Sequence, residues 1–296
     1  MSTLLPAADQ RDRARERLLG IILVVLSASI FAGVDGLSKL LADTSSVAQI
    51  VWARYALALP ILLATTQPSQ LPTLFRTRQP GLQILRGLAP VMVSIAMVFG
   101  VRYLPLAEAT VILFAAPFLV AALSVPLLGE RVHASTWVAV VIGFAAVLIV
   151  ARPGFSELSL FALFPLVGAI FYAALQLITR RIAATGERSE TTLAWTLLTG
   201  IVVATPFALY FWQPLDIRGW ALMFGLGGTF GLAQLMMIRG FAHAPAALLA
   251  PLSYVQIVSA AILGVVVFHD VPDVWTLLGI VMIIISGVYV VRRRTD

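Results

Sequence analysis

Charged side chains lie inside apolar segments of this sequence. The stretch GVDGLSKLLAD (residues 33–43) places Asp35 and Lys39 one helical turn apart, and Arg54 and Glu108 fall in later apolar segments. An ionisable group within a membrane span is costly, and it generally faces a bundle interior or a water-filled cavity. A cation near an anion suits the carboxylate and the ammonium of a zwitterion, so we predict that these four residues bind such a ligand. The alternative is internal salt bridging, Asp35 with Lys39 and Arg54 with Glu108, and the sequence leaves both open.

Aromatic and amide side chains recur in the same kind of segment. The aromatic candidates are Tyr55, Phe114, Phe171, Trp195 and Tyr254, and the amide candidates are Gln176, Gln234 and Gln256. An apolar wall with a few polar groups suits a small amphipathic ligand, so we predict that these residues line a substrate cavity. Aromatic residues also pack protein cores, and amides also hydrogen-bond one helix to another, so these packing roles stay open.

Several other chemistries find no support in the sequence. Cysteine is absent, which removes thiol chemistry and cysteine metal sites. The three histidines are far apart, so we expect no metal site. The stretch GLGGTFG (225–231) resembles a phosphate-binding loop but lacks the Lys-Ser/Thr that completes one. Since no nucleophile motif is visible either, we expect neither an enzyme nor a cofactor.

The composition indicates what must position these residues. Hydrophobic residues make up 60% of the 296 positions and charged residues only 11%, whereas soluble domains carry about 25% charged residues. A helix of about 20 residues crosses the hydrocarbon core of a bilayer. Ten apolar windows of that kind predict an all-α integral membrane protein with ten transmembrane helices, near 18–41, 47–66, 82–101, 104–128, 135–151, 158–179, 191–212, 217–240, 245–268 and 272–291.

The distribution of basic residues predicts the orientation of these spans. Of the 20 lysines and arginines, 15 fall on the side that holds both termini, four on the opposite side, and Arg54 within a span. The positive-inside rule then places both termini, including a charged tail over residues 1–17, in the cytoplasm. The net charge of +6 is explained by this orientation, so we expect no nucleic-acid partner.

The sequence also contains an internal repeat. A shift of 140 positions brings Gly87 onto Gly227 and Gly100 onto Gly240. We predict that these four glycines are hinges at matched places in two halves. The same shift leaves the charges at Asp35, Lys39, Arg54 and Glu108 without charged counterparts, which suits an asymmetric ligand better than a symmetric scaffold.

The repeat predicts the architecture. Residues 18–155 and 156–296 each hold five predicted spans within one membrane domain. Because five is odd, the second half enters the bilayer from the opposite side, which makes the halves inverted repeats. Inverted repeats with a binding site near the midplane are typical of secondary transporters.

Two stretches of the chain resemble a known family. LPLAEATVILFAAPFLVAALSVPLLGERV (104–132) and APAALLAPLSYVQIVSAAILGVVVFHDVP (244–272) are similar to the repeated helix of the drug/metabolite transporter superfamily, EamA type. Gly129–Glu130 belongs to that pattern. His269–Asp270 stands at the equivalent place in the second half, where it departs from the pattern. In general appearance the chain also resembles YddG-like exporters of amino acids.

The resemblance implies a function. A member of this family is expected to export small metabolites across the cytoplasmic (inner) membrane, here most plausibly aromatic or neutral amino acids, by alternating access. The alternatives are an exporter of drugs or other small amphipathic metabolites, and a membrane enzyme acting on lipids. The expected partners are the lipid bilayer and a small-molecule substrate, with the protein a monomer or a homodimer.

Overall fold

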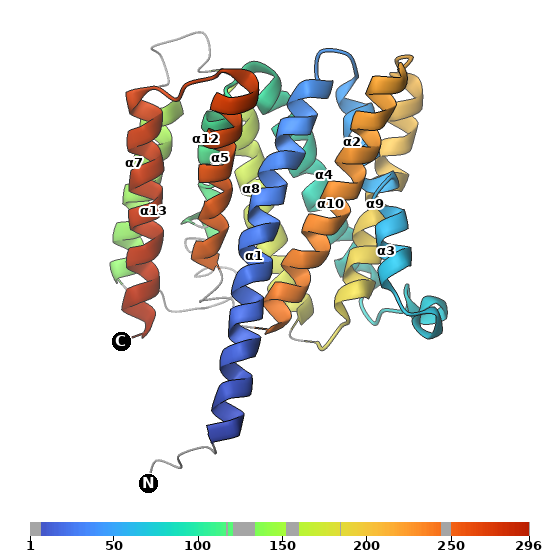
Figure 1. Ribbon diagram of the computed structural model, residues 1–296, viewed down its shortest axis with the longest axis horizontal. Coiled ribbons are helices and arrows are strands. Elements are labelled where there is room, and N and C mark those ends of the chain that lie inside the picture. Colours follow the sequence, from blue (N-terminus) through green and yellow to red (C-terminus); the bar gives the residue numbers. More distant parts are fainter. Residues whose placement is uncertain are drawn as a thin grey trace.

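The computed structural model describes residues 7–116, 118–120, 134–151, 160–183, 185–243 and 250–295, and regular structure within these ranges is helical (Figure 1). The α-helices are α1 (Ala7–Leu41), α2 (Val47–Ala56), α3 (Leu59–Thr65), α4 (Pro80–Tyr103), α5 (Leu106–Leu113), α7 (Ala134–Ala151), α8 (Leu163–Ala183), α9 (Ser189–Tyr210), α10 (Ile217–His243), α12 (Val255–Phe268) and α13 (Val274–Thr295). Two short 3₁₀ helices are η1 (Pro68–Thr73) and η3 (Ala250–Tyr254), and residues 118–120 are also helical.

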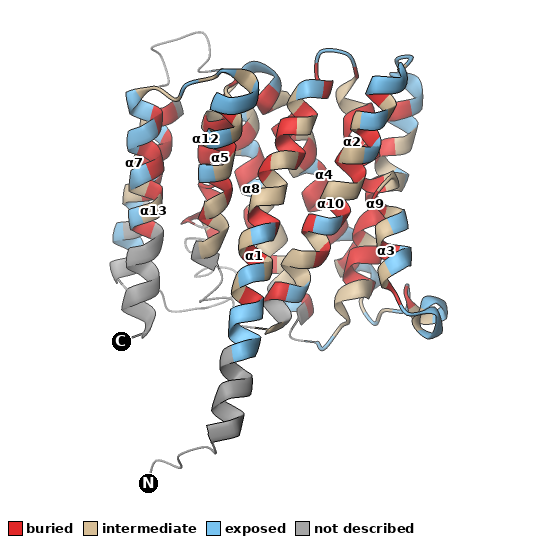
Figure 2. Ribbon diagram, viewed as in Figure 1, coloured by how far each residue is buried: buried red, intermediate tan, exposed pale blue. Residues whose placement is uncertain are grey.

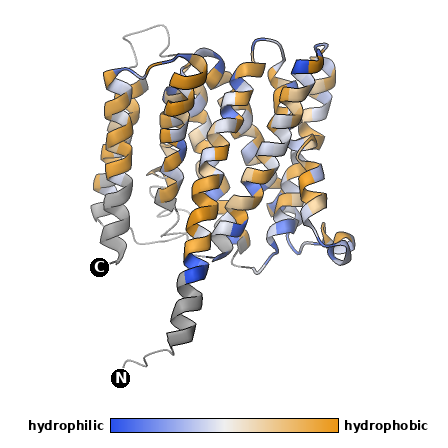
Figure 3. Ribbon diagram, viewed as in Figure 1, coloured by the Kyte–Doolittle hydropathy of each residue, from blue (hydrophilic) through white to orange (hydrophobic). Residues whose placement is uncertain are grey.

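The helices account for the ten expected spans. Five are long and apolar enough to cross a membrane: Arg15–Leu41, Val47–Thr65, Pro80–Tyr103, Ser189–Tyr210 and Ile217–Gly240. Five shorter apolar segments cover the rest: Leu106–Val120, Val141–Val150, Leu163–Thr179, Leu252–Phe268 and Val274–Ser286. Apolar side chains also cover the outside of the bundle, among them Val141, Val202, Ile262 and Val266 (Figures 2 and 3). A bundle that is apolar both inside and outside is the expected fold in lipid.

The two halves run through the bundle in opposite senses. Lys39, near the end of α1, contacts Leu104 after α4 and Asp270 after α12, so these three helices finish together, at what we call the Lys39 end. The second half starts at that same end, because Phe161 stacks on Tyr103 just before α8 begins. Helix α1 begins and helix α13 ends on the side of the bundle away from the Lys39 end (Figure 1). The protein is therefore an all-α membrane protein of two inverted five-helix repeats.

Proline positions explain where helices differ from the predicted spans. The span expected at 47–66 is two helices, because α2 stops at Ala56 and α3 begins at Leu59 with Pro60 in its first turn. Proline is tolerated there because the first N–H groups of a helix have no partner within the helix. Pro90 and Pro206 instead lie inside the continuous helices α4 and α9, as helix bundles in membranes permit.

The buried apolar core forms two main clusters, and each draws on both halves. One cluster joins α5 and α7 to α8, α12 and α13, and the other joins α2 to α9 and α10. Helices α1 and α4 contribute residues to both clusters, for example Ala32 and Val34 from α1 and Met97 and Val98 from α4. These two helices therefore stand between the clusters, and they carry several of the buried polar groups described next, among them Asp35 and Arg86.

Candidate functional site

Arg54 forms a buried ion pair across α1 and α2. Its Nη2 donates to Asp35 Oδ1 at 2.9 Å and to Ser38 Oγ at 2.6 Å. Gln256 Nε2, on α12, donates to the second carboxylate oxygen of Asp35 at 3.4 Å. Arg54 is only 4% exposed and Asp35 only 5%. The pair satisfies most of its own hydrogen bonds, although Arg54 Nε has no partner among the described residues.

A second ion pair closes the Lys39 end. Lys39 Nζ lies 2.5 Å from Asp270 Oδ2 and 4.8 Å from the centre of the Phe268 ring. Lys39 Nζ also donates to the Leu104 carbonyl oxygen at 3.5 Å. Because Lys39 and Leu104 belong to the first half and Asp270 to the second, this contact ties the halves together. The side chains are 20% and 33% exposed, so water reaches the pair.

His269 explains why Asp270 meets Lys39. It ends α12 in the left-handed conformation, with φ of 58°, and the Asp270 N–H donates to the Gly264 carbonyl at 2.9 Å. Glycine is the usual residue at this position of a helix end, since it has no Cβ to crowd the carbonyl. His269–Asp270 of the second half thus forms a helix-terminating turn. Gly129–Glu130 itself lies outside the described residues.

The charge pairs differ from the salt bridges considered from the sequence. Asp35 pairs with Arg54 rather than with Lys39, because both lie on facing surfaces of α1 and α2. Glu108 does not pair with Arg54. Its Oε1 instead accepts from Thr276 Oγ1 at 3.5 Å, which links α5 to α13. Among the described residues, the charges therefore act between helices and not within one.

Tyr55 continues the polar groups toward the other end of the bundle. It is fully buried, and its hydroxyl lies 3.1 Å from Ser94 Oγ on α4. Its ring meets Phe230 edge-on at 5.2 Å, and α9 approaches it so closely at Gly200 that a Cβ there would overlap the ring. Tyr55 thus sits where helices from both halves meet.

Arg86 is a buried cation that the sequence interpretation treated as one of the basic residues of the cytoplasmic side. It lies about 9 Å along α4 from Pro80 by helical rise, and it is 7% exposed. Its Nε donates to Thr179 Oγ1 on α8 at 2.9 Å, and its Nη1 donates to Thr196 Oγ1 on α9 at 2.5 Å. No carboxylate of the described residues lies within ion-pair distance of it. The only warning in the sequence is that Arg86 falls inside the predicted span 82–101.

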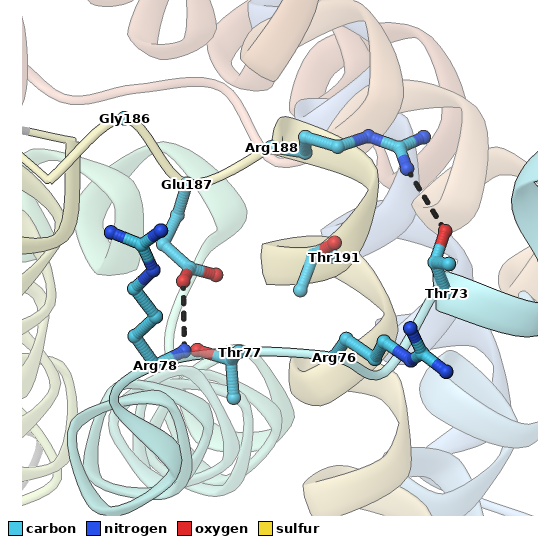
Figure 4. A pocket seen from close by; sticks show the side chains of 8 residues that line it. All are labelled: Thr73, Arg76, Thr77, Arg78, Gly186, Glu187, Arg188 and Thr191. Atoms are coloured by element: carbon cyan, nitrogen blue, oxygen red, sulfur yellow. Dashed lines mark hydrogen bonds between the residues drawn. The ribbon is translucent and has the colours of Figure 1, made fainter.

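A polar cavity of about 410 Å³ opens at the end of the bundle opposite Lys39 (Figure 4). It is lined by Thr73, Arg76, Thr77, Arg78, Gly186, Glu187, Arg188 and Thr191. The Arg78 N–H donates to Glu187 Oε1 at 3.1 Å, and Arg188 Nη1 donates to Thr73 Oγ1 at 3.4 Å. The loop before α4 and the loop before α9 therefore meet here, one from each half.

Gln83 connects this cavity to Arg86. Its Nε2 lies 3.5 Å from Glu187 Oε2 at the cavity and 3.4 Å from Thr192 Oγ1. Thr192 and Thr196 are one turn apart on α9. Gln83 and Arg86 are likewise neighbours on one face of α4. Gln83 is 1% exposed, and its Oε1 finds no partner among the residues described.

The remaining aromatic and amide candidates lie in the core, at the cavity end or in half-buried positions. Phe114 and Tyr254, which the internal repeat relates, meet at 5.6 Å between ring centres and are buried in the core. Trp195 lies at the cavity end of α9, where its indole N–H donates to the Phe75 carbonyl at 3.2 Å. Phe171, Gln176 and Gln234 are half-buried on α8 and α10. The structure does not test whether these residues contact a ligand.

The four glycines predicted as hinges all lie where two helices touch. A Cβ at Gly87 would lie 2.7 Å from Thr199 Cβ, and one at Gly227 would lie 2.7 Å from the Ala53 carbonyl oxygen. A Cβ at Gly100 would meet Pro165, and one at Gly240 would meet Val24. These contacts give each glycine a packing role, and bending at these positions stays a prediction.

Together the buried polar groups form a column that follows α1 and α4. It passes from the Gln83 contacts through Arg86, Ser94 with Tyr55, and Arg54 with Asp35, to Lys39 with Asp270. Within the described residues no cluster of histidine, aspartate and glutamate could hold a metal. The column can therefore offer charge and hydrogen bonds to a polar solute, while both its flanks are apolar.

A family model matches the chain twice. The EamA-like transporter family is matched over residues 18–152 and again over residues 159–292. The chain is 28% identical to the pseudopaline exporter CntI of Pseudomonas aeruginosa over 277 residues, which cover 93% of this chain and 96% of that protein. It is 27% identical to an S-adenosylmethionine uptake transporter of Rickettsia bellii over 280 residues, covering 95% and 96%.

The fold has a counterpart among solved structures. One crystal structure superposes on this chain with a TM-score of 0.62 at 18% sequence identity, and the match covers 96% of this chain and 99% of the other. This similarity supports the architecture described above.

Proposed function

The chain belongs to the EamA-like transporter family, and from this premise we propose that it exports small zwitterionic metabolites, neutral or aromatic amino acids above all, by alternating access. The relatives named above include one exporter and one uptake transporter, so the outward direction is part of the proposal. We further propose the cytoplasmic membrane as its location and the cytoplasm as the side of both termini, as the excess of basic residues at that end favours.

The observation that carries this proposal is the polar column at the seam between the inverted halves. Ionisable groups inside membrane spans are costly and generally mark a solute path. Here the column includes two buried arginines, and a cavity lined by arginine, threonine and glutamate side chains lies at one end of the bundle. Its length and its position between two apolar clusters suit a solute that crosses along α1 and α4.

Contacts join the two halves at both ends of the bundle, so alternating access requires a different set to break on each side. At the Lys39 end, the Lys39–Asp270 pair joins the halves, and Gln256 ties α12 to Asp35. At the other end the halves meet through loop contacts around the cavity (Figure 4). Opening outward then requires that Lys39 and Asp270 separate. Residues 18–155 and 156–296 would be the two moving units, with Gly87, Gly100, Gly227 and Gly240 as points where helices bend.

Counterflow in proteoliposomes tests the proposal. Purified protein is reconstituted into vesicles loaded with one unlabelled amino acid, and the entry of the same labelled amino acid is followed. We expect saturable accumulation that empty vesicles lack, and competition by other neutral amino acids. Protein that moves none of a panel of neutral and aromatic amino acids would contradict the proposed substrate class.

A further inference from the structure

Arg86 stands out among the charged groups of the column because no carboxylate of the described residues pairs with it. The guanidinium offers five N–H donors, and described hydroxyl groups accept from Nε and from Nη1. Arginine keeps its proton in proteins, so this buried group is positive. A buried charge is normally paired, because an unpaired one is expensive to remove from water.

The surroundings of Arg86 orient the guanidinium without satisfying its charge. Thr179 and Thr196 come from two helices of the second half, whereas Arg86 comes from the first. Each threonine also donates to a carbonyl of its own helix, Leu175 and Thr192 respectively, which leaves its oxygen free to accept from arginine. The guanidinium is thereby fixed in one plane. A fixed planar fork is well suited to a carboxylate, which it can bind through two parallel hydrogen bonds.

Hydrogen-bonded side chains connect the cavity lining to the surroundings of Arg86. Gln83 touches the cavity residue Glu187 at one side and Thr192 at the other, and Thr192 is one turn from the Arg86 partner Thr196. The unpartnered Oε1 of Gln83 is buried, so this segment has an acceptor to offer as well. Arg76, Arg78 and Arg188 around the cavity give its mouth a positive character that attracts anions.

We propose that Arg86 is the anion-binding position of the carrier, where the carboxylate of the cargo takes the place of the missing counter-ion. The inference rests on the proposed transport function and narrows it to cargo with a carboxylate group. Since the site joins α4 to α8 and α9, a bound carboxylate would also contact both halves at once.

Matched ligand pairs test this position by binding to the purified protein. L-phenylalanine and L-leucine are compared with phenylalaninol and leucinol, which keep the side chain and the ammonium but replace the carboxylate by a hydroxymethyl group. We expect wild-type protein to prefer the acids by about 10–100-fold, as charge-assisted hydrogen bonds to one carboxylate imply. Arg86→Gln should reduce that preference to below about threefold, and Arg86→Lys should retain part of it.

Two further variants keep the test decisive. Arg102→Gln removes an exposed arginine from the other end of the same helix and should bind as wild type. Thr196→Val removes a hydroxyl that orients the guanidinium, and it should weaken acid binding by about tenfold while leaving amino-alcohol binding within about twofold. Loss of affinity for acids and alcohols alike would indicate a structural role for Arg86 and would overturn the inference.

Failure of the inference is distinguishable from failure of the proposed function. Equal affinity for acids and alcohols in wild-type protein, binding of neither, or an undiminished acid preference in Arg86→Gln, would overturn the anion position whatever counterflow shows. Acids that bind at Arg86 and yet show no counterflow would leave the anion position standing and would overturn the transport proposal.

Discussion

The two buried arginines of the column, Arg54 and Arg86, differ in how the protein treats their charge. Arg54 has a carboxylate at 2.9 Å, and that carboxylate is itself held by Gln256. Arg86 is comparably buried but is held only by the hydroxyls of Thr179 and Thr196 among the described residues. The first arrangement pairs the charge, although Arg54 Nε has no partner among the described residues, whereas the second has no anion among those residues.

On our proposal, the difference separates a structural role at Arg54 from a binding role at Arg86. A satisfied ion pair between α1, α2 and α12 holds helices in place, and its removal should be felt mainly as lost stability. An oriented but uncompensated cation costs stability, and a protein tolerates that cost where function requires it. The same residue type thus serves opposite purposes at two levels of one column.

The largest expected effect comes from breaking the Arg54 pair. Asp35→Asn should lower the free energy of unfolding by about 3 kcal/mol, because it leaves Arg54 as a buried charge without a partner. Unfolding in detergent, followed by circular dichroism with increasing denaturant, measures the change. The double variant Asp35→Asn with Arg54→Gln should recover most of the loss, since neither charge then remains. Equal instability of the single and double variants would argue that the pair is not a unit.

The second effect compares the helix contacts beside each arginine. Gly227→Ala should cost about 2 kcal/mol, because the new Cβ meets the backbone oxygen of Ala53, which cannot move without α2. Gly87→Ala should cost about 1 kcal/mol, because its Cβ meets the side chain of Thr199.

A compensating change sharpens that comparison. Thr199→Ser removes the methyl group, which the new Cβ would meet at 3.2 Å, and lets the hydroxyl rotate more freely, while Thr199 Cβ at 2.7 Å remains. It should therefore relieve a small part of the Gly87→Ala cost without relieving Gly227→Ala. Thermal unfolding of the three single variants and the two combinations gives the result. Equal rescue of both glycine variants by Thr199→Ser would show that the contact is not local.

The third effect has the opposite sign from the first. Arg86→Gln should leave the protein as stable as wild type or about 1 kcal/mol more stable, because it removes a buried charge that the structure does not pair. The matched variant Arg54→Gln should be destabilising, because it leaves Asp35 as a buried charge without its partner. Melting temperatures of the two variants in the same detergent make the comparison. A loss of stability in Arg86→Gln as large as in Arg54→Gln would remove the distinction between the two sites.

The smallest effect is expected at the Lys39 end. Lys39→Gln should change the free energy of unfolding by less than about 1 kcal/mol, since the Lys39–Asp270 pair is partly exposed to water. Raising the salt concentration should shrink the difference between variant and wild type further. Denaturant unfolding at low and high salt tests both statements, and a larger, salt-independent loss would show that the pair is more buried than its exposure indicates.

Much of the fold follows from the sequence because lipid restricts what a chain can do. Spans of apolar residues must be helical, and an odd number of spans in each repeat must invert the second half. A proline such as Pro60 can break a helix, but the sequence does not show whether the helix breaks or continues through it. Pro60 starts a new helix, whereas Pro90 and Pro206 do not interrupt theirs, and only the neighbouring helices decide between these outcomes.

The candidate site was predicted in part. The sequence shows that Asp35, Lys39 and Arg54 lie in apolar surroundings, but partner choice depends on helix rotation, which periodicity does not fix. Lys39 pairs with a residue 231 positions away. Arg86 was counted with loop cations because a basic residue near a span end usually lies in the interface. Its burial depends on its contacts with Thr179 and Thr196, and these long-range contacts cannot be predicted from a single sequence.

The missing counter-ion of Arg86 has an electrical consequence. The guanidinium returns to its starting place at the end of each cycle, so the net charge moved across the bilayer per cycle is that of the cargo alone. A zwitterion bound by its carboxylate crosses without electrical work. A cargo with one net negative charge, held by the same fork, would gain about 2.3 kcal/mol per 100 mV on leaving a compartment with a negative interior. The current carried by reconstituted vesicles therefore reports the ionic form in which the cargo travels.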